Sequence, residues 1–93
     1  MTDMERKTFC AAISCYGARA QITMAFEEMA ELQDALCKRL RGRDVASAHI
    51  AEELADVGIM LDQMAVLFEV EDAVAEQRAY KAQRLLRRLK YDS

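Results

Sequence analysis

The chain has no proline and only three glycines among its 93 residues. Proline breaks helices and glycine weakens them, and both residues favour the turns that join β-strands. A chain without them forms long helices easily and β-hairpins with difficulty. At this length it makes one domain, which we place at residues 1–93. We therefore expect an all-α fold.

Glycines and polar turn residues divide the chain into four predicted helices. They run from Met4 to Tyr16, from Ala18 to Leu40, from Asp44 or Ser47 to Phe68, and from Glu71 to Lys90. Asp44 and Ser47 are the two candidate caps of the third helix, because short polar side chains accept hydrogen bonds from free helix N–H groups. Gly17 and Gly42 follow the first two helices, as is common at helix C-termini.

Two acidic clusters stand out within the second and third helices. The first is Glu27-Glu28-Met29-Ala30-Glu31, and the second is Glu52-Glu53-Leu54-Ala55-Asp56. Each contains carboxylates three residues apart, which lie on the same side of a helix about one turn apart. If the two helices pack together, four carboxylates meet around one point. Such a cluster is costly unless it binds a cation, and its oxygen atoms suit Mg²⁺ or Mn²⁺.

Apolar residues at helical spacing predict the packing faces of the second and third helices. The second helix carries Ile22, Phe26, Met29, Leu32, Leu36 and Leu40, and the third carries Ile50, Leu54, Val57, Leu61, Met64 and Phe68. Ile59 and Val66 lie on the far side of the third helix, so this helix is apolar on two faces. We expect the core on one face and a second subunit on the other.

The fourth helix is amphipathic and basic. Gln77, Lys81, Arg84 and Arg88 follow one another along one flank of its apolar side. Such a row can bind phosphates. Basic residues in the last turn of a helix, such as Arg87 and Lys90, also complement the helix dipole without any ligand. This structural role applies less to Lys81 and Arg84, which lie earlier in the helix.

The remaining composition limits the class of protein. The three cysteines, Cys10, Cys15 and Cys37, show no C-x-x-C pattern, which predicts reduced thiols in a cytoplasmic protein. We expect no signal peptide, because no apolar stretch follows the first residues, and no membrane helix. A net charge of −3 argues against a dedicated nucleic-acid binder.

The acidic residues and their neighbours resemble a known family. One helix carries E-E-x-x-E at Glu27, Glu28 and Glu31, and the next carries E-x-x-D at Glu53 and Asp56. This pattern resembles the MazG-like all-α nucleoside triphosphate pyrophosphohydrolases. The segments Tyr16–Gln21, Cys37–Gly42, His49–Val57 and Tyr80–Leu85 are similar to the phage and prophage branch of that family. The resemblance extends from about residue 9 to residue 90.

The resemblance implies a fold, a reaction and a set of site residues. The fold is a four-helix bundle that assembles into a homodimer or a dimer of dimers. The reaction is Mg²⁺-dependent hydrolysis of a nucleoside triphosphate between the α and β phosphates, which clears nucleotides from the pool. By correspondence, Glu28, Glu31, Glu53 and Asp56 bind the metal, and Glu27 orients or deprotonates the attacking water. Lys38, Lys81 and Arg84 neutralise the phosphates, and Gln21 contacts the nucleotide.

The same residues also fit three functions without catalysis. Glutamates are good helix formers, and most of them are solvated, so the acidic residues can belong to a helical interaction module. The chain can instead bind a nucleotide or a metal without turning it over and regulate a partner. A basic-tail nucleic-acid binder is the third alternative, since the last helix is basic. His49 lies one turn before Glu53, but a single histidine is a weak metal signal and is interpreted as a surface or packing residue.

Overall fold

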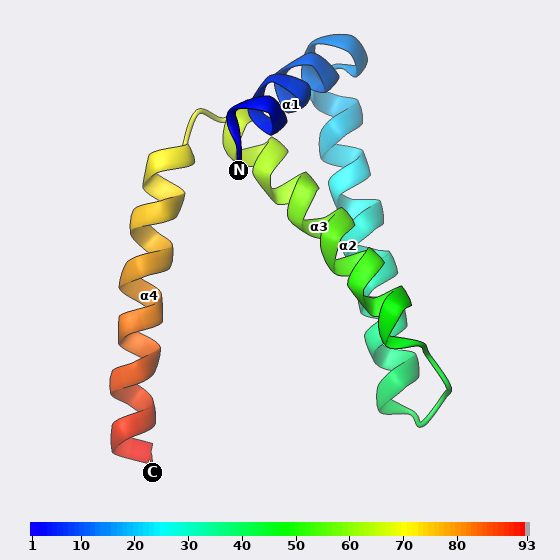
Figure 1. The fold of residues 1–93 in the computed structure, drawn as a ribbon, viewed down its shortest axis with the longest axis vertical. Coiled ribbons are helices and arrows are strands. Elements are labelled where there is room, and N and C mark those ends of the chain that lie inside the picture. The colour runs from blue at the N-terminus through cyan, green and yellow to red at the C-terminus, as the bar shows by residue number, and fades with distance from the viewer. Residues whose placement is uncertain (93) are drawn as a thin grey trace.

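The computed structural model describes residues 1–92, which form four α-helices and no β-strand (Figure 1). The helices are α1 (Asp3–Tyr16), α2 (Ala18–Leu40), α3 (Ser47–Leu67) and α4 (Glu71–Asp92). The prediction of an all-α fold with four helices is confirmed. Within the described residues, no helix combines the length and the apolar character needed to cross a membrane.

The ends of the helices follow from local sequence, with one exception. Thr2 and Glu5 form a reciprocal capping box at the start of α1, with N···O distances of 2.7 and 3.1 Å. Gly42 has φ 78° and ends the turn after α2. The predicted cap of α3 was wrong, because the residue before this helix is Ala46, which has no side-chain hydrogen-bond acceptor. The start of α3 therefore depends on its packing against α2.

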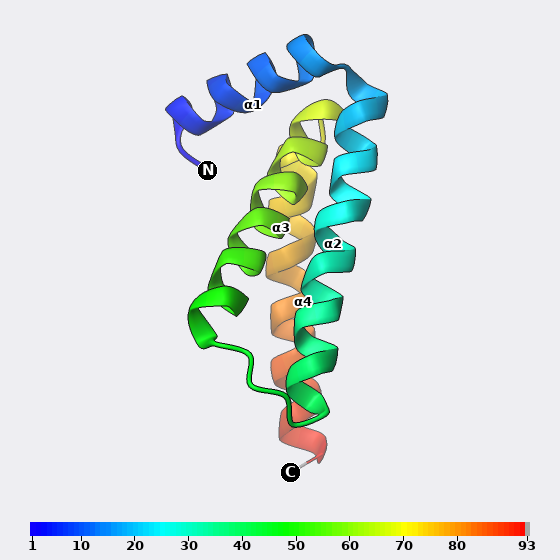
Figure 2. The same cartoon turned by 90° about the vertical axis from the view of Figure 1, so that its right-hand side faces the viewer.

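α2 and α3 form an antiparallel pair, and α1 crosses one end of that pair (Figures 1 and 2). The seam between α2 and α3 contains Ala25 and Ala35 from α2 and Met60 from α3, all at most 5% exposed. Phe9 of α1 is buried and so are Ala65 and Val66 at the end of α3. Small alanines let the two long helices approach closely, and this seam positions the acidic residues described below.

The predicted apolar stripes of α2 and α3 are only partly buried in this chain. Phe26 is 64% exposed and Leu54 is 54% exposed. The exposed residues of the two stripes are Phe26, Leu36 and Leu40 of α2 and Leu54, Leu61 and Phe68 at or near α3. Of the two residues assigned to the far side of α3, Val66 is buried and Ile59 is 42% exposed. The prediction of the core face was therefore only partly correct. The other six stripe residues are half-buried: Ile22, Met29, Leu32, Ile50, Val57 and Met64. The seam is formed instead by alanine, methionine, glutamine and glutamate side chains.

α4 leaves the end of α3 and diverges from it (Figure 1). The turn contains Glu69 in a left-handed conformation, with φ 56°, and the amide of Val70 donates to the carbonyl of Ala65 at 3.0 Å. These bonds satisfy the last carbonyl groups of α3 and set the direction in which α4 departs. Within the described residues, no residue of α4 is buried.

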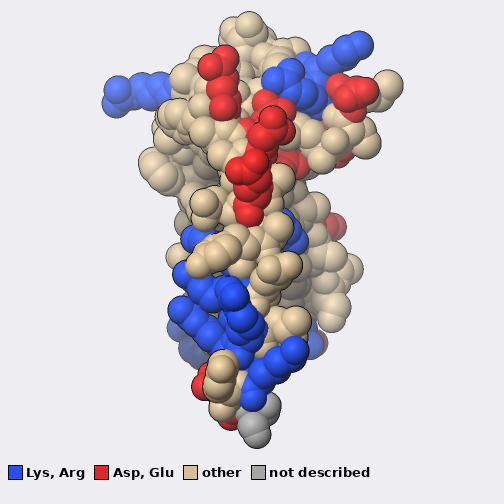
Figure 3. Space-filling model, turned by 90° about the vertical axis from the view of Figure 1, so that its left-hand side faces the viewer, with Lys and Arg blue, Asp and Glu red and all other residues tan. Residues whose placement is uncertain are grey.

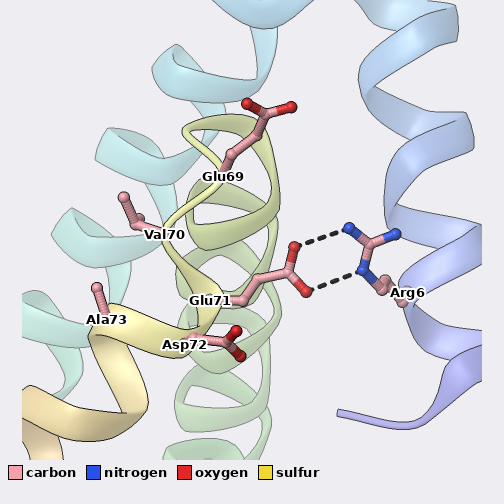
Figure 4. Close-up of a pocket in the computed structure, with 6 residues that line it drawn as sticks. All are labelled: Arg6, Glu69, Val70, Glu71, Asp72 and Ala73. Atoms are coloured by element: carbon pink, nitrogen blue, oxygen red, sulfur yellow. Dashed lines mark hydrogen bonds and ion pairs between the residues drawn. The ribbon is translucent and has the colours of Figure 1, made fainter.

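A paired interaction attaches the start of α4 to α1. The Arg6 guanidinium donates two hydrogen bonds of 2.8 Å to the Glu71 carboxylate, one from Nε and one from a terminal nitrogen (Figure 4). Glu69 and Asp72 line the same surface hollow, of about 590 Å³. Because Arg6 is already engaged by Glu71, the described part of the chain offers this hollow no free cation for an anionic ligand.

We expect acid to loosen this attachment. Hydrogen bonding from Arg6 lowers the pKa of Glu71 below its ordinary value of 4.5. The pairing therefore contributes its full stabilisation at neutral pH, and this stabilisation is lost as the pH falls through the lowered folded-state pKa of Glu71. The protection factors of amides near the start of α4 should fall as the pH drops through the lowered pKa of Glu71, and Glu71→Gln should show the lower protection already at pH 7. Asp72→Asn, its exposed neighbour, is the matched control, and equal effects of the two substitutions would contradict the assignment.

The isolated chain exposes more surface than a compact protein of its size. Its accessible area is 7412 Å², whereas a folded monomer of this mass is expected to expose about 5,400 Å². The radius of gyration is 16.1 Å, against about 12 Å for a compact chain of this length. Much of the additional area belongs to the large apolar side chains of α2, α3 and α4.

Candidate acidic metal centre

The carboxylates of the candidate site face each other across the seam between α2 and α3. On α2, Gln21, Ala25 and Glu28 follow one another at intervals of three and four residues, and the same line continues to Leu32 and Ala35. Gln21, Ala25 and Ala35 are buried, so this line is the face that packs on α3. Glu28 is thereby held in the seam by the alanines that flank it.

α3 supplies two carboxylates to the same place. Glu53 is only 8% exposed, and Asp56 follows it by one helical turn at the solvent edge of the seam. One carboxylate oxygen from each of Glu28, Glu53 and Asp56 lies within 4.8 Å of the other two. The predicted meeting of the two acidic clusters is thus present for these three residues.

Two oxygens in this group are buried without a hydrogen-bond partner. They are one Oε of Glu28 and one Oε of Glu53. An unpaired polar atom in the interior costs about 1–3 kcal/mol, and more when it is charged. Within residues 1–92, no lysine or arginine forms an ion pair with Glu28, Glu53 or Asp56. In the described residues, the one ion pair to this group comes from His49, whose Nε2 lies 3.7 Å from a Glu53 oxygen.

Burial and like charge act together on Glu28. Desolvation raises the pKa of Glu28 above its ordinary value of 4.5, and the nearby charges of Glu31, Asp56 and Glu53 raise this pKa further. A bound cation would relieve both causes, because it replaces lost hydration and offsets the mutual repulsion. Oxygen donors at this spacing suit a hard ion such as Mg²⁺ or Mn²⁺, so the residues present fit the metal that the sequence implied.

Glu31 lies at the mouth of the site. It is exposed and does not belong to the group of three close oxygens, although its charge acts on Glu28. With Asp34, His49 and Glu53, it lines a hollow of about 430 Å³. An exposed carboxylate at the edge of the hollow could serve as a further oxygen ligand to a metal.

Two residues at this hollow were not assigned a role from the sequence. His49 Nε2 lies 3.7 Å from a Glu53 oxygen, so the histidine interpreted as a surface or packing residue borders the site. Asp34 pairs with Lys38 at 2.8 Å, and that hydrogen bond lowers the pKa of Asp34. Asp34 follows Glu31 by three residues, which was the available signal that both face one side of α2.

The structure disperses the other predicted site residues. Glu27 is exposed and borders a different hollow, formed with Tyr16, Arg19 and Thr23. Lys38 lies beyond Asp34, near the loop after α2. Gln21 is buried and its amide donates to the Gln63 oxygen at 2.8 Å, so it lies inside the seam.

The Gln21–Gln63 hydrogen bond should stabilise the seam next to the carboxylates. We expect Gln63→Ala to lower the free energy of unfolding by about 1–3 kcal/mol, because it leaves the buried amide of Gln21 without an acceptor. Urea denaturation measures the change. The double variant Gln21→Leu/Gln63→Leu removes both polar partners and should lose much less stability. If the double variant is the less stable of the two, the hydrogen bond is not the source of the effect.

Lys81 and Arg84 lie on α4, apart from the seam. The basic side chains gather on the C-terminal half of this helix (Figure 3). The Arg84 guanidinium stacks over the ring of Tyr80, 5.8 Å from its centroid. In the single chain, α4 contacts α3 near their junction and diverges beyond it, so the row of cations does not face the carboxylates (Figure 1).

A comparison of the chain with known protein families, with curated proteins and with solved structures found no match.

Proposed function

We propose that the chain is a Mg²⁺-dependent nucleoside triphosphate pyrophosphohydrolase of the MazG-like all-α type. The observation that carries this proposal is the group formed by Glu28, Glu53 and Asp56, whose oxygens lie within 4.8 Å of one another. Two of the buried oxygens at this group have no partner. Buried carboxylate oxygens usually have a hydrogen-bond partner, so the unpartnered oxygens of Glu28 and Glu53 are available to a metal. The other carboxylate oxygen of Glu53 lies 3.7 Å from His49 Nε2.

The reaction that fits this site is hydrolysis of a phosphoric anhydride. A nucleoside triphosphate repels a hydroxide nucleophile, and carboxylates alone would increase that repulsion. When bound, Mg²⁺ or Mn²⁺ supplies the positive charge that neutralises the phosphates and lowers the pKa of a coordinated water. Glu28, Glu31, Glu53 and Asp56 would hold the metal, with Glu31 at the open side where the phosphates enter.

The remaining assignments follow from position. Glu27 adjoins Glu28 on α2 and is exposed, so it can orient the attacking water from the solvent side. Lys38 lies on the same helix near the hollow that holds His49 and can meet the phosphate chain when its pairing with Asp34 opens. Gln21 is engaged with Gln63 inside the seam, so we assign it to packing rather than to nucleotide binding.

The proposed products are a nucleoside monophosphate and pyrophosphate, and the proposed role is clearance of nucleotides from the pool. We also place the chain in the cytoplasm, because its three cysteines show no pattern of a disulfide framework. The area exposed by the single chain supports assembly into a homodimer or a dimer of dimers.

Pyrophosphate release from a panel of ribonucleoside and deoxyribonucleoside triphosphates tests the proposal. We expect release in the presence of MgCl₂ and none in EDTA, with the panel identifying the preferred base and sugar. Monophosphate and pyrophosphate should appear in equal amounts, whereas cleavage at the γ phosphate would give orthophosphate. Tight nucleotide binding by the folded protein without release would instead favour a regulatory binding protein.

A further inference from the structure

α3 and α4 diverge from their junction like the two arms of a V (Figure 1). At the narrow end lies a hollow of about 630 Å³ with a mixed lining. Its apolar side is formed by Gly58, Leu61 and Ala65 of α3 and by Val74 and Ala75 of α4, and its rim carries the charged residues Asp62, Glu71 and Arg78. Farther along the two arms, apolar residues continue at helical spacing. The exposed ones are Leu54 of α3 and Leu85, Leu86 and Leu89 of α4.

The size of the uncovered surface points to a large and permanent partner. The chain exposes 7412 Å², which exceeds the value for a compact monomer by about 2,000 Å². A stable interface of ordinary size buries only about 800 Å² on each partner. An excess of this size is typical of obligate assemblies, in which each subunit completes the core of the other.

A second copy of the same chain matches the V in length and in charge. α3 has 21 residues and α4 has 22, so an α4 inserted beside a partner's α3 covers it from end to end. The stretch from Gln77 to Tyr91 contains six basic residues and no acidic residue. Residues 27–34 and 52–62, which flank the candidate site, contain eight acidic residues and no basic residue. The like charges within each region repel one another, whereas the basic region and the acidic region attract each other.

We propose that two chains interlock through these V-shaped faces and that each α4 brings Lys81 and Arg84 to the carboxylate site of the other chain. This inference rests on the proposed function and assigns the cations of each site to the partner subunit. The apolar face of α4 would pack on the partner's Leu54 and Leu61. Lys81, Arg84 and Arg88 lie together on one flank of that face, which would place them beside the seam between the partner's α2 and α3.

The arrangement explains why α4 leaves its own body. The divergence of α3 and α4 separates Lys81 and Arg84 from the carboxylates of the same chain (Figure 1). In a two-fold dimer, the contact that one chain makes is returned by the other, so two complete sites form together. The cations would stabilise the negative charge on the departing pyrophosphate, opposite the carboxylates.

Paramagnetic broadening by Mn²⁺ can test the exchange of α4 without any measurement of activity. An isotope-labelled chain with Glu28→Gln and Glu53→Gln cannot hold the metal but keeps its α4. It is unfolded and refolded with an excess of unlabelled wild-type chain, and Mn²⁺ is added. We expect strong broadening of the Lys81 and Arg84 amide signals in the labelled chain. Unbroadened signals, in a sample where labelled wild type alone shows broadening at Glu28 and Glu53, would overturn the proposal.

Activity gives a second and independent test by complementation. A Glu53→Gln chain and a Lys81→Ala/Arg84→Ala chain should each lose at least about 100-fold in pyrophosphate release. After mixed refolding, random pairing should restore roughly a quarter of the wild-type sites if the cations act across the dimer. If each chain uses its own cations, mixing restores nothing. Arg87→Ala/Lys90→Ala removes the same charge from another side of α4 and is the matched control.

The two proposals fail in different ways. A wild-type chain that binds no Mn²⁺ and releases no pyrophosphate would overturn the proposed function. Sedimentation equilibrium would then still test whether the interlocked dimer exists. The wild type should form dimers, and Leu85→Asp/Leu89→Asp should give monomers. A wild-type chain that is active as a monomer would overturn the interlocked dimer and leave the proposed function standing.

Discussion

Glu53→Gln is expected to lower pyrophosphate release by about 10³-fold or more and, at the same time, to raise the melting temperature of the metal-free protein. The loss of activity follows from the removal of one charged ligand from the proposed metal site, where electrostatic stabilisation carries most of the catalytic effect. Initial rates at saturating Mg²⁺ and nucleotide, together with differential scanning calorimetry in EDTA, measure both changes on one preparation.

The gain in stability follows from the surroundings of Glu53. This side chain is 10% exposed, one of its oxygens has no hydrogen-bond partner, and it lies beside the carboxylates of Glu28 and Asp56. Glutamine has nearly the same shape without the charge, so it removes the repulsion and the cost of burying an ion. We expect a rise of about 2–6 °C in the melting temperature for a domain of this size.

Glu52→Gln provides the matched control. Glu52 adjoins Glu53 on the same helix, but its side chain is 76% exposed, so the same chemical change should leave both activity and stability nearly unaltered. If Glu53→Gln destabilises the metal-free protein, Glu53 stabilises the fold and the proposed metal site is wrong. A variant that keeps normal turnover would contradict the site equally.

The acidic site could be predicted from spacing alone in large part. Glu28 and Glu53 belong to i, i+3 pairs on neighbouring helices, so the members of each pair lie on one side of their helix. The two pairs meet because these sides face each other in the packed helices. Glu31 is less well determined, because its place at the mouth of the site depends on how far α2 is rotated about its axis. Asp34 and His49 border the same hollow, and only the relative position of α2 and α3 shows this.

The buried faces could be predicted only in part from apolar periodicity. The pattern ranked the faces of α2 and α3 by hydrophobicity and selected the ones with Phe26 and Leu54, which are exposed in the single chain. The seam actually contains Ala25, Ala35 and two glutamines. Alanine is only weakly hydrophobic and glutamine is polar, so a hydrophobicity pattern does not select the face that carries them. Periodicity identifies a face that avoids water, but it does not say whether that face is covered within the chain.

The course of α4 also depends on information beyond local pattern. Its apolar side predicts packing against a neighbour, but the turn at Glu69 directs it away from α3. A non-glycine residue in a left-handed conformation carries no clear sequence signal, because asparagine and glycine are the residues usually expected there. The separation of α4 from the carboxylates therefore could not be predicted from the sequence.

Mg²⁺ is expected to stabilise the wild-type protein strongly and in a pH-dependent way. A ligand that binds only the folded state adds about 2.7 kcal/mol at a concentration 100 times its Kd. The raised pKa of Glu28 gives the sign of the pH effect. Because its folded-state pKa lies above the ordinary value, ionised Glu28 destabilises the metal-free fold, and stability is lost as the pH rises through the raised pKa.

The metal reverses that loss, since it binds the ionised carboxylates and competes with their protons. The rise in melting temperature on adding Mg²⁺ should therefore be larger at pH 8 than at pH 5, and it should vanish in Glu28→Gln/Glu53→Gln. Thermal scans with MgCl₂, with EDTA and with KCl at equal ionic strength separate specific binding from screening. An equal shift in the wild type and the double variant would show that the ion binds elsewhere, because only the wild type has the ionised pair in the seam.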